Sequence, residues 1–336
     1  MKALVVCLDG MTGVLLAGPA VRALATRADH VTLMCGPRGE EAARLLPHVD
    51  DVLVWEAPWT GPRPPTVDEA DVDGLLERLR DESYDVALVL TSFEQSPLPA
   101  ALLLRMAYVR HIGADSADDS GSLIDGPHRR LPGRHDAEAA LDTAAALGFL
   151  PRPGDDGRLR VLPTPDTAAL TGNGPYVVLH PGAGTPARSW GADRAAEAVA
   201  LLADAGHRVV VTGGPREAAL THEVSGGTAV DLGGRTDLRT LAGVLRAADV
   251  VIAGNTGPAH LAAATGTPVV SVFSPVVPAE RRGPYGVPTV LLGDQNSPCA
   301  ATRARHCPVP GHPCLTEVTA QDVVRGVQKL LSGRSG

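Results

Sequence analysis

The sequence predicts an α/β protein of two domains, each built on a parallel sheet that helices cover on both faces. Its 336 residues suit two domains. Short apolar runs alternate with longer segments of helical periodicity, as in parallel strands joined by right-handed crossovers. The alternation stops over residues 151–175, which are rich in Pro, Gly and Asp, and then starts again. We place the two domains at residues 1–165 and 166–336.

In the first half, each strand is predicted from a short run of apolar residues, many of them β-branched. These runs cover residues 3–8, 30–35, 51–55 and 84–90. Each helix between them is predicted from apolar residues that recur at three- and four-residue spacing. The helical segments cover residues 14–26, 40–46 and 72–79.

The second half repeats the pattern. Strands are predicted at residues 176–179, 208–211, 230–232, 250–253 and 269–273. Helices are predicted at residues 192–203, 217–224, 238–247 and 259–264, with a closing helix at 319–331. Because ligands bind beyond the carboxyl ends of strands in open parallel sheets, we expect the ligand in a cleft between the two domains.

Composition excludes several classes of protein. The net charge is −8 and aromatic residues make up 3%, which argues against a nucleic-acid binder. No apolar run is long enough to span a membrane, and the first one is too short for a signal peptide. We expect a cytoplasmic protein, with peripheral contact at the inner membrane face left open. Only Lys2 and Lys329 are lysines, so a cation that contacts an anionic ligand should be arginine.

The first candidate loop follows the first strand and consists of Asp9, Gly10, Met11, Thr12 and Gly13. Its glycines allow a close approach of the backbone, and amides of the next helix should point into it. Asp9 is the only carboxylate of the loop. It is either a turn residue that caps the helix or a general base.

The second candidate loop covers residues 180–190. Gly182, Gly184 and Thr185 could surround a phosphate, and Arg188 could neutralise it with a bidentate contact. The loop matches neither the P-loop motif nor the dinucleotide-binding glycine motif.

The third candidate loop leads from a strand that ends near Ala253 into a helix that starts near Pro258. Asn255 or Thr256 can cap this helix, and the free amides at its start suit a pyrophosphate. His260 lies on the first helical turn, where it either packs in the core or contacts a ligand.

Three cysteines, Cys299, Cys307 and Cys314, lie close in sequence to His306 and His312. Their spacing lacks the close Cys-x-x-Cys pair that is typical of structural zinc, so we expect no metal. Ordinary thiols in a reducing compartment, or one disulfide, are the remaining interpretations.

Several motifs occur together and in order: HPGAG with ARSW, VVVTGGPRE, DLGGRTDL, GNTGPAHLAAATGTPVVSVFSP and GPYG. This series resembles glycosyltransferase family 9, the heptosyltransferases, and LDGMTGVLLAGPAVRAL resembles the opening segment of that family. The resemblance covers almost the whole chain. It implies the GT-B fold, in which two Rossmann-like domains face each other across a cleft.

The resemblance also implies a reaction. An inverting transferase of this family moves a sugar from a nucleotide-diphosphate sugar, usually ADP-heptose, and needs no metal. The donor would lie on the C-terminal domain and the acceptor on the N-terminal domain, beside residues 10–13. Arg188 would bind phosphate, Glu217 would hold the ribose and Thr236 would line the adenine pocket. The other implied donor-binding residues are Gly184, Thr185, Asn255, Thr256, Gly257 and His260.

Two positions depart from the family pattern. The family places its catalytic aspartate where this chain has Gly13, and another aspartate where it has Asn255. Asp9 could replace the base, or the acceptor could be an amine that needs little deprotonation. The alternatives are a degenerate nucleotide-sugar-binding protein without transfer activity and a GT-B sugar-nucleotide 2-epimerase.

The acceptor and the oligomeric state are not determined by the sequence. The acceptor could be lipopolysaccharide core, another cell-surface glycan or a small secondary metabolite. The lack of a basic amphipathic helix favours a soluble small acceptor.

Overall fold

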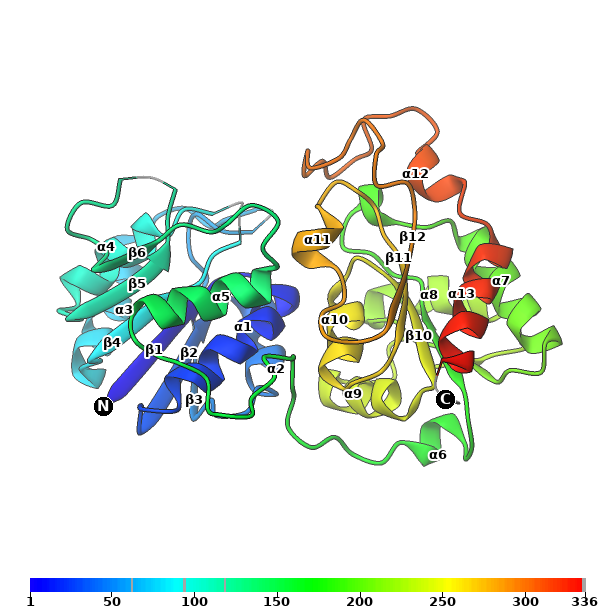
Figure 1. The fold of residues 1–336 in the computed structure, drawn as a ribbon, viewed down its shortest axis with the longest axis horizontal. Helices are drawn as coiled ribbons and strands as arrows, with labels where there is room; N and C mark the ends of the chain where they lie inside the picture. The colour runs from blue at the N-terminus through cyan, green and yellow to red at the C-terminus, as the bar shows by residue number, and fades with distance from the viewer. Residues whose placement is uncertain (62, 93–94, 118, 334–336) are drawn as a thin grey trace. The chain divides into compact units, whose positions relative to one another are not determined.

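A computed structural model describes residues 1–61, 63–92, 95–117 and 119–333. The chain divides into two compact units, Met1–Leu162 and Pro163–Gly336. Each unit contains one six-stranded parallel sheet with helices packed on it (Figure 1). The predicted fold class, an α/β protein with two parallel sheets, is therefore confirmed.

The sheet of the first unit has the strand order β3-β2-β1-β4-β5-β6. Its strands are β1 (Lys2–Cys7), β2 (His30–Cys35), β3 (Asp51–Val54), β4 (Val86–Val89), β5 (His111–Asp115) and β6 (Gly126–His128). This is the strand order of the doubly wound dinucleotide-binding fold. The chain runs outward in opposite directions from β1 and β4, so the point between their carboxyl ends is the expected binding position.

Helices cover both faces of this sheet. They are α1 (Met11–Leu24), α2 (Glu40–Ala43) after the short turn η1 (Pro37–Gly39), α3 (Glu69–Glu82), α4 (Leu98–Met106) and α5 (Asp136–Ala146). Helix α1 packs against α2 and α5, and α3 packs against α4. Because side chains alternate along a strand, Leu4, Val6 and Leu8 lie in one buried cluster with Leu79 of α3 and Leu104 of α4.

The sheet of the second unit has the order β12-β11-β10-β7-β8-β9, which repeats the topology of the first. Its strands are β7 (Val177–His180), β8 (Val209–Val211), β9 (Val230–Asp231), β10 (Val250–Gly254), β11 (Val269–Val272) and β12 (Thr289–Leu292). The equivalent position for a ligand lies between the carboxyl ends of β7 and β10.

The longer helices of the second unit are α7 (Ala192–Asp204), α8 (Ala218–Ser225), α9 (Leu238–Ala247), α10 (Gly257–Ala264) and α13 (Ala320–Ser332). Helix α7 packs against α8 and α13, and α9 packs against α10 (Figure 1). The shorter elements are α6 (Ala168–Thr171), η2 (Pro186–Arg188), η3 (Pro215–Glu217), α11 (Ala279–Arg282) and α12 (Pro313–Thr316).

Each predicted strand and helix is present, with ends that differ by a few residues. The difference between prediction and structure that matters most for the candidate site is at the first candidate loop. Helix α1 begins at Met11, so Met11, Thr12 and Gly13 form its first turn instead of a loop. The sequence did not predict α4, β5, β6 and α5 in the first unit, or α6, α11, α12 and β12 in the second.

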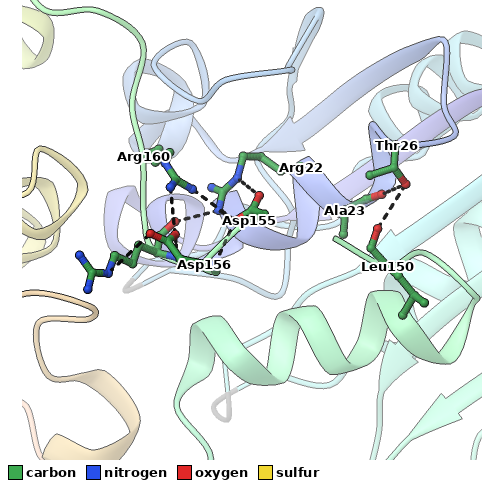
Figure 2. A network of polar contacts seen from close by, with 9 residues as sticks. Arg22, Ala23, Thr26, Leu150, Asp155, Asp156 and Arg160 are labelled. Atoms are coloured by element: carbon green, nitrogen blue, oxygen red, sulfur yellow. Dashed lines mark hydrogen bonds and ion pairs between the residues drawn. The ribbon is translucent and has the colours of Figure 1, made fainter. Parts of the chain in front are cut away.

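The segment that leaves the first unit is fastened to α1 (Figure 2). Arg22, which is 8% exposed, donates two hydrogen bonds of 2.8 Å to the carboxylate of Asp155 and one of 2.9 Å to the carbonyl of Arg158. The Arg22 guanidinium holds the pKa of the Asp155 carboxyl well below its usual range. Further along, the Leu162 amide donates to the carbonyl of Leu45. Residues 155–162 therefore belong structurally to the first unit.

Candidate functional site

In the first unit, Asp9 lies between the carboxyl ends of β1 and β4. It directly follows Leu8, the first residue after β1. Its Oδ2 accepts a 3.0 Å hydrogen bond from the Ser92 amide, and its Oδ1 accepts one of 2.9 Å from Nε2 of Gln95. Ser92 and Gln95 both follow β4. The side chain of Asp9, in the loop after β1, is therefore held at the expected binding position by the loop after β4.

Asp9 also covers Gly13 on the first turn of α1. A Cβ atom at residue 13 would lie 2.4 Å from Cβ of Asp9 and 2.9 Å from its Oδ2. The Asp9 side chain thus fills the space that a side chain at residue 13 would need. Asp9 is not the cap residue of α1: the N-cap is Gly10, and no side chain makes a cap bond there.

In the second unit, a small pocket lies between the carboxyl ends of β7 and β10. Its walls come from the two strands, from β11 and from the loop after β7. The lining residues are Leu179, His180, Pro181, Gly182, Arg188, Trp190, Ile252, Ala253, Gly254 and Val272. Arg188 ends the turn η2, is half-buried and brings a guanidinium group to this lining.

Buried oxygen atoms also lie in the segments that follow β7 and β10. Oγ1 of Thr185, Oδ1 of Asn255 and Oγ1 of Thr256 are buried, and none has a hydrogen-bond partner within the described part of the chain. Thr256 is the N-cap residue of α10, but its side chain makes no cap bond. A buried polar atom without a hydrogen-bond partner destabilises the folded protein. Several such atoms in these segments are typical of a site whose hydrogen bonds a bound ligand completes.

The loop after β8 places a carboxylate against the loop after β7. Oε2 of Glu217 accepts a 2.8 Å hydrogen bond from the Gly214 amide and lies 3.7 Å from Nε2 of His180. The other ring nitrogen of His180 is 3.0 Å from Oγ1 of Thr212. Burial lowers the pKa of His180 more than the Glu217 carboxylate raises it, so the imidazole is neutral at neutral pH. The Glu217 contact is therefore not an ion pair under these conditions.

Glu217 also packs against the backbone of the loop after β7. A Cβ atom at Gly182 would lie 1.9 Å from Oε1 of Glu217, so only glycine leaves room for this carboxylate. Gly182 of the second candidate loop therefore has a specific structural role.

The remaining predicted residues lie along the same edge of the sheet or next to it. Thr236 lies between β9 and the N-cap of α9, Asp237. Gly184 is exposed in the loop after β7, and Gly257 is the first residue of α10. His260 is buried in the first turns of α10, where 2% of its surface is exposed.

The sequence motifs do not single out Ser92, Gln95 or the contact between His180 and Glu217. Ser92 and Gln95 follow the predicted strand at residues 84–90. The rule that ligands bind where neighbouring strands diverge is the signal that could have found them.

None of the five cysteines forms a disulfide. Burial raises the pKa of the Cys314 thiol to about 11 and that of Cys35 to about 12, so both stay protonated at neutral pH. Cys299 is also buried, whereas Cys307 is partly exposed. Among residues 1–333, with the gaps given above, no group of three His, Cys, Asp or Glu side chains could hold a metal ion.

No helix in the described ranges combines the length and the apolar character that crossing a bilayer requires.

Comparisons with known proteins agree on one family. The profile of glycosyltransferase family 9 (heptosyltransferase) matches residues 73–312. The chain is 28% identical to lipopolysaccharide heptosyltransferase 1 of Escherichia coli K12 over 226 residues, which is 65% of this chain and 69% of that protein.

Two solved structures are similar in fold. A family 9 glycosyltransferase from Veillonella parvula has a TM-score of 0.76 and 16% identity, covering 99% of this chain and 97% of that one. The ADP-heptose lipopolysaccharide heptosyltransferase II of Escherichia coli has a TM-score of 0.75 and 18% identity, with both chains covered in full.

Proposed function

This chain belongs to glycosyltransferase family 9 and is a glycosyltransferase, and from this premise we propose that it transfers a heptose from ADP-heptose to a small-molecule or cell-surface glycan acceptor, with inversion at the anomeric carbon. The fold agrees with the GT-B architecture of heptosyltransferases. The observation on which the proposal rests is the position of Asp9, whose carboxylate fills the space above Gly13.

We assign the role of general base to Asp9. The family aspartate is missing at Gly13, but Asp9 brings a carboxylate to the same first turn of α1. Gln95 and the Ser92 amide orient it through one hydrogen bond to each oxygen. A carboxylate fixed in this way can take a proton from an acceptor hydroxyl group, provided the hydroxyl lies within hydrogen-bond distance.

The donor is expected on the second unit. Arg188 would neutralise the diphosphate, and the amides at the start of α10 would add the positive end of the helix dipole. Thr185, Asn255 and Thr256 offer buried oxygen atoms that ligand or water hydrogens could satisfy. The neighbouring loops after β8 and β9 would hold the ribose at Glu217 and the adenine near Thr236. Gly184, Gly257 and His260 complete the proposed donor residues.

The proposed reaction is a single displacement. The acceptor oxygen attacks the anomeric carbon from the face opposite the diphosphate and gives its proton to Asp9. The bond between the anomeric carbon and the diphosphate oxygen breaks, and ADP leaves. Arg188 and the helix amides stabilise the negative charge that develops on the leaving group, so the step needs no metal.

An assay of ADP release tests this proposal. The full chain is incubated with ADP-heptose and a panel of acceptors, and ADP is measured together with the glycosylated product. We expect acceptor-dependent ADP release that falls by about a hundredfold or more in Asp9→Asn, because the variant lacks the base. Asp73→Asn, an exposed carboxylate change on α3, is the matched control.

Other outcomes would contradict the proposal. ADP-heptose that binds without turnover across the panel would indicate a degenerate binding protein. An epimerised nucleotide sugar formed without any acceptor would indicate an epimerase. Full activity of Asp9→Asn would remove Asp9 from the role of base.

A further inference from the structure

A segment of the second unit is bonded to the turn that carries Arg188. This β12–α12 segment, residues 299–312, lies between β12 and α12 in the chain (Figure 1). The Ala187 amide donates a 3.0 Å hydrogen bond to the carbonyl of Arg305, and Nε2 of His312 lies 3.2 Å from the carbonyl oxygen of Ala187. A carbonyl oxygen can only accept, so Nε2 of His312 carries the hydrogen of this bond. Both backbone polar groups of Ala187 are therefore bonded to the β12–α12 segment.

Ala187 determines where Arg188 lies. Ala187 is the central residue of the turn η2 and is fully buried. Arg188 follows it directly, and the Arg188 amide donates a 3.0 Å hydrogen bond to the carbonyl of Thr185 within the same turn. A shift of Ala187 would therefore move the Arg188 guanidinium that lines the pocket between β7 and β10. A guanidinium binds phosphate through a rigid fork of N–H groups, so its affinity depends on its position.

The β12–α12 segment is itself bonded to the loop after β11. The amides of Ala301 and Arg303 donate hydrogen bonds of 2.9 and 2.8 Å to the carbonyls of Pro275 and Val276. At the start of the segment, Cys299 is fully buried. The segment is therefore anchored independently of η2, and it can hold the turn in place.

His312 has an unusual backbone conformation for a residue other than glycine. Its φ is 53°, in the left-handed region that a Cβ atom disfavours. Such a conformation persists where the surrounding contacts require it. His312 is the N-cap residue of α12, but its side chain makes no cap bond. The hydrogen bond that its ring does make is the one to Ala187.

We infer that His312 is a positioning residue for donor binding, which holds Arg188 in place through the backbone of Ala187. The inference rests on the proposed function, because Arg188 is the residue proposed to neutralise the diphosphate. His312 is not among the residues that line the pocket between β7 and β10, so its effect on the donor passes through the turn. A guanidinium that is already in position loses less freedom when the diphosphate binds.

ADP binding to the full chain, measured by calorimetry, tests this role. His312→Phe keeps a ring but removes the N–H group, whereas His312→Gln keeps an N–H group at the end of a side chain of similar length. We expect the Kd for ADP to rise about tenfold in His312→Phe and to change by less than about twofold in His312→Gln. Adenosine, which has no phosphate, should bind equally to both variants in ligand-observed NMR. His306→Phe, at an exposed position of the same segment, is the matched control.

A double variant separates positioning of Arg188 from general support of the second unit. If His312 acts through Arg188, His312→Phe should not weaken ADP binding further in a chain that already carries Arg188→Ala. Three results would overturn the inference. They are unchanged ADP binding in His312→Phe, adenosine binding that weakens as much as ADP binding, and additive losses in the double variant.

Arg188→Ala alone separates this inference from the proposed function. If Arg188→Ala weakens ADP binding and His312→Phe does not, only the inference about His312 is wrong. If the unsubstituted chain does not bind ADP, or Arg188→Ala binds it equally well, the proposed donor site is wrong and the inference falls with it.

Discussion

The Asp9 side chain occupies the space next to Gly13: a Cβ atom at residue 13 would lie 2.4 Å from Cβ of Asp9. Two residues four positions apart, on either side of the start of α1, therefore cannot both have side chains in this arrangement. A carboxylate at this position can come from residue 9 or from residue 13, but not from both.

Because side chains at residues 9 and 13 exclude each other, the result of moving the carboxylate from residue 9 to residue 13 can be predicted. Gly13→Asp alone should lower kcat and stability, because its Cβ forces the Asp9 side chain away from Gln95. The double variant Asp9→Gly with Gly13→Asp should regain much of the activity, since it restores one carboxylate without the overlap. Steady-state kinetics and thermal unfolding of the three variants check this. A double variant no more active than Asp9→Gly alone would contradict a shared position for the base.

The hydrogen bond from Gln95 to Asp9 predicts an effect on turnover. Gln95→Leu keeps a similar side-chain volume but removes the donor to Oδ1 of Asp9. We expect kcat to fall about tenfold while the KM for the donor stays unchanged, because the base is less well oriented and the donor loops are intact. Gln328→Leu, at an exposed position of α13, is the control. A change confined to the donor KM would disprove this positioning role.

The packing of Glu217 against Gly182 predicts a donor-specific effect. Gly182→Ala would place Cβ 1.9 Å from Oε1 of Glu217, so the carboxylate must move. We expect the KM for the donor to rise about tenfold with a smaller change in kcat, since the proposed ribose contact is made in the ground state as well. Gly74→Ala is the control, because nothing lies within 4 Å of a Cβ at that exposed position of α3. An unchanged donor KM would argue against the ribose role.

The pairing of Arg22 with Asp155 predicts a pH-dependent stability. The pKa of Asp155 is lowered in the folded protein from its ordinary value of 3.8. The contribution of this ion pair to the free energy of unfolding is therefore complete at pH values above the ordinary pKa of Asp155. It is lost as the pH falls toward the pKa of Asp155 in the folded protein. At pH 7, Asp155→Asn should lower the free energy of opening of α1, measured by amide exchange, by about 1–3 kcal/mol. The difference from the unsubstituted protein should shrink below pH 4.

Asp156→Asn is the matched control for this pairing. The Asp156 side chain is 44% exposed and pairs with Arg158 and Arg160, so we expect a change below about 0.5 kcal/mol. Equal losses in the two variants, or a difference that grows at low pH, would contradict the assignment.

Much of the fold could be predicted because its central strands are almost purely apolar. Strands β1, β4, β7 and β10 are buried on both sides over most of their length, and each consists mainly of Val, Leu, Ala or Ile. Two of the edge strands, β6 and β12, lack this signal. Strand β6 is Gly-Pro-His, and β12 alternates exposed and half-buried residues, so tertiary contacts determine both.

The sequence predicted the loops that carry the candidate residues, but not the contacts that these residues make. The motifs place Asp9 and Asn255 directly after strands and Arg188 in the loop after a strand, and the structure has them in those loops. They do not reveal that Met11, Thr12 and Gly13 are helical, since Thr and Gly are weak helix formers. The bonds from Ser92 and Gln95 to Asp9 join residues more than 80 positions apart, and local sequence patterns do not report such contacts.

The bond between Arg22 and Asp155 also determines where the chain can be divided for separate expression. A fragment that ends at Leu150, after α5, would leave the 8%-exposed guanidinium of Arg22 without its carboxylate partner. Such a fragment should unfold locally around α1, because it lacks the charge-assisted hydrogen bonds from Arg22 to Asp155 and the hydrogen bond to the carbonyl of Arg158. Ending the fragment at Leu162 keeps both the carboxylate and the backbone bond to Leu45. The Pro- and Gly-rich segment after α5 is therefore better regarded as the last structural part of the first unit than as a dispensable tether.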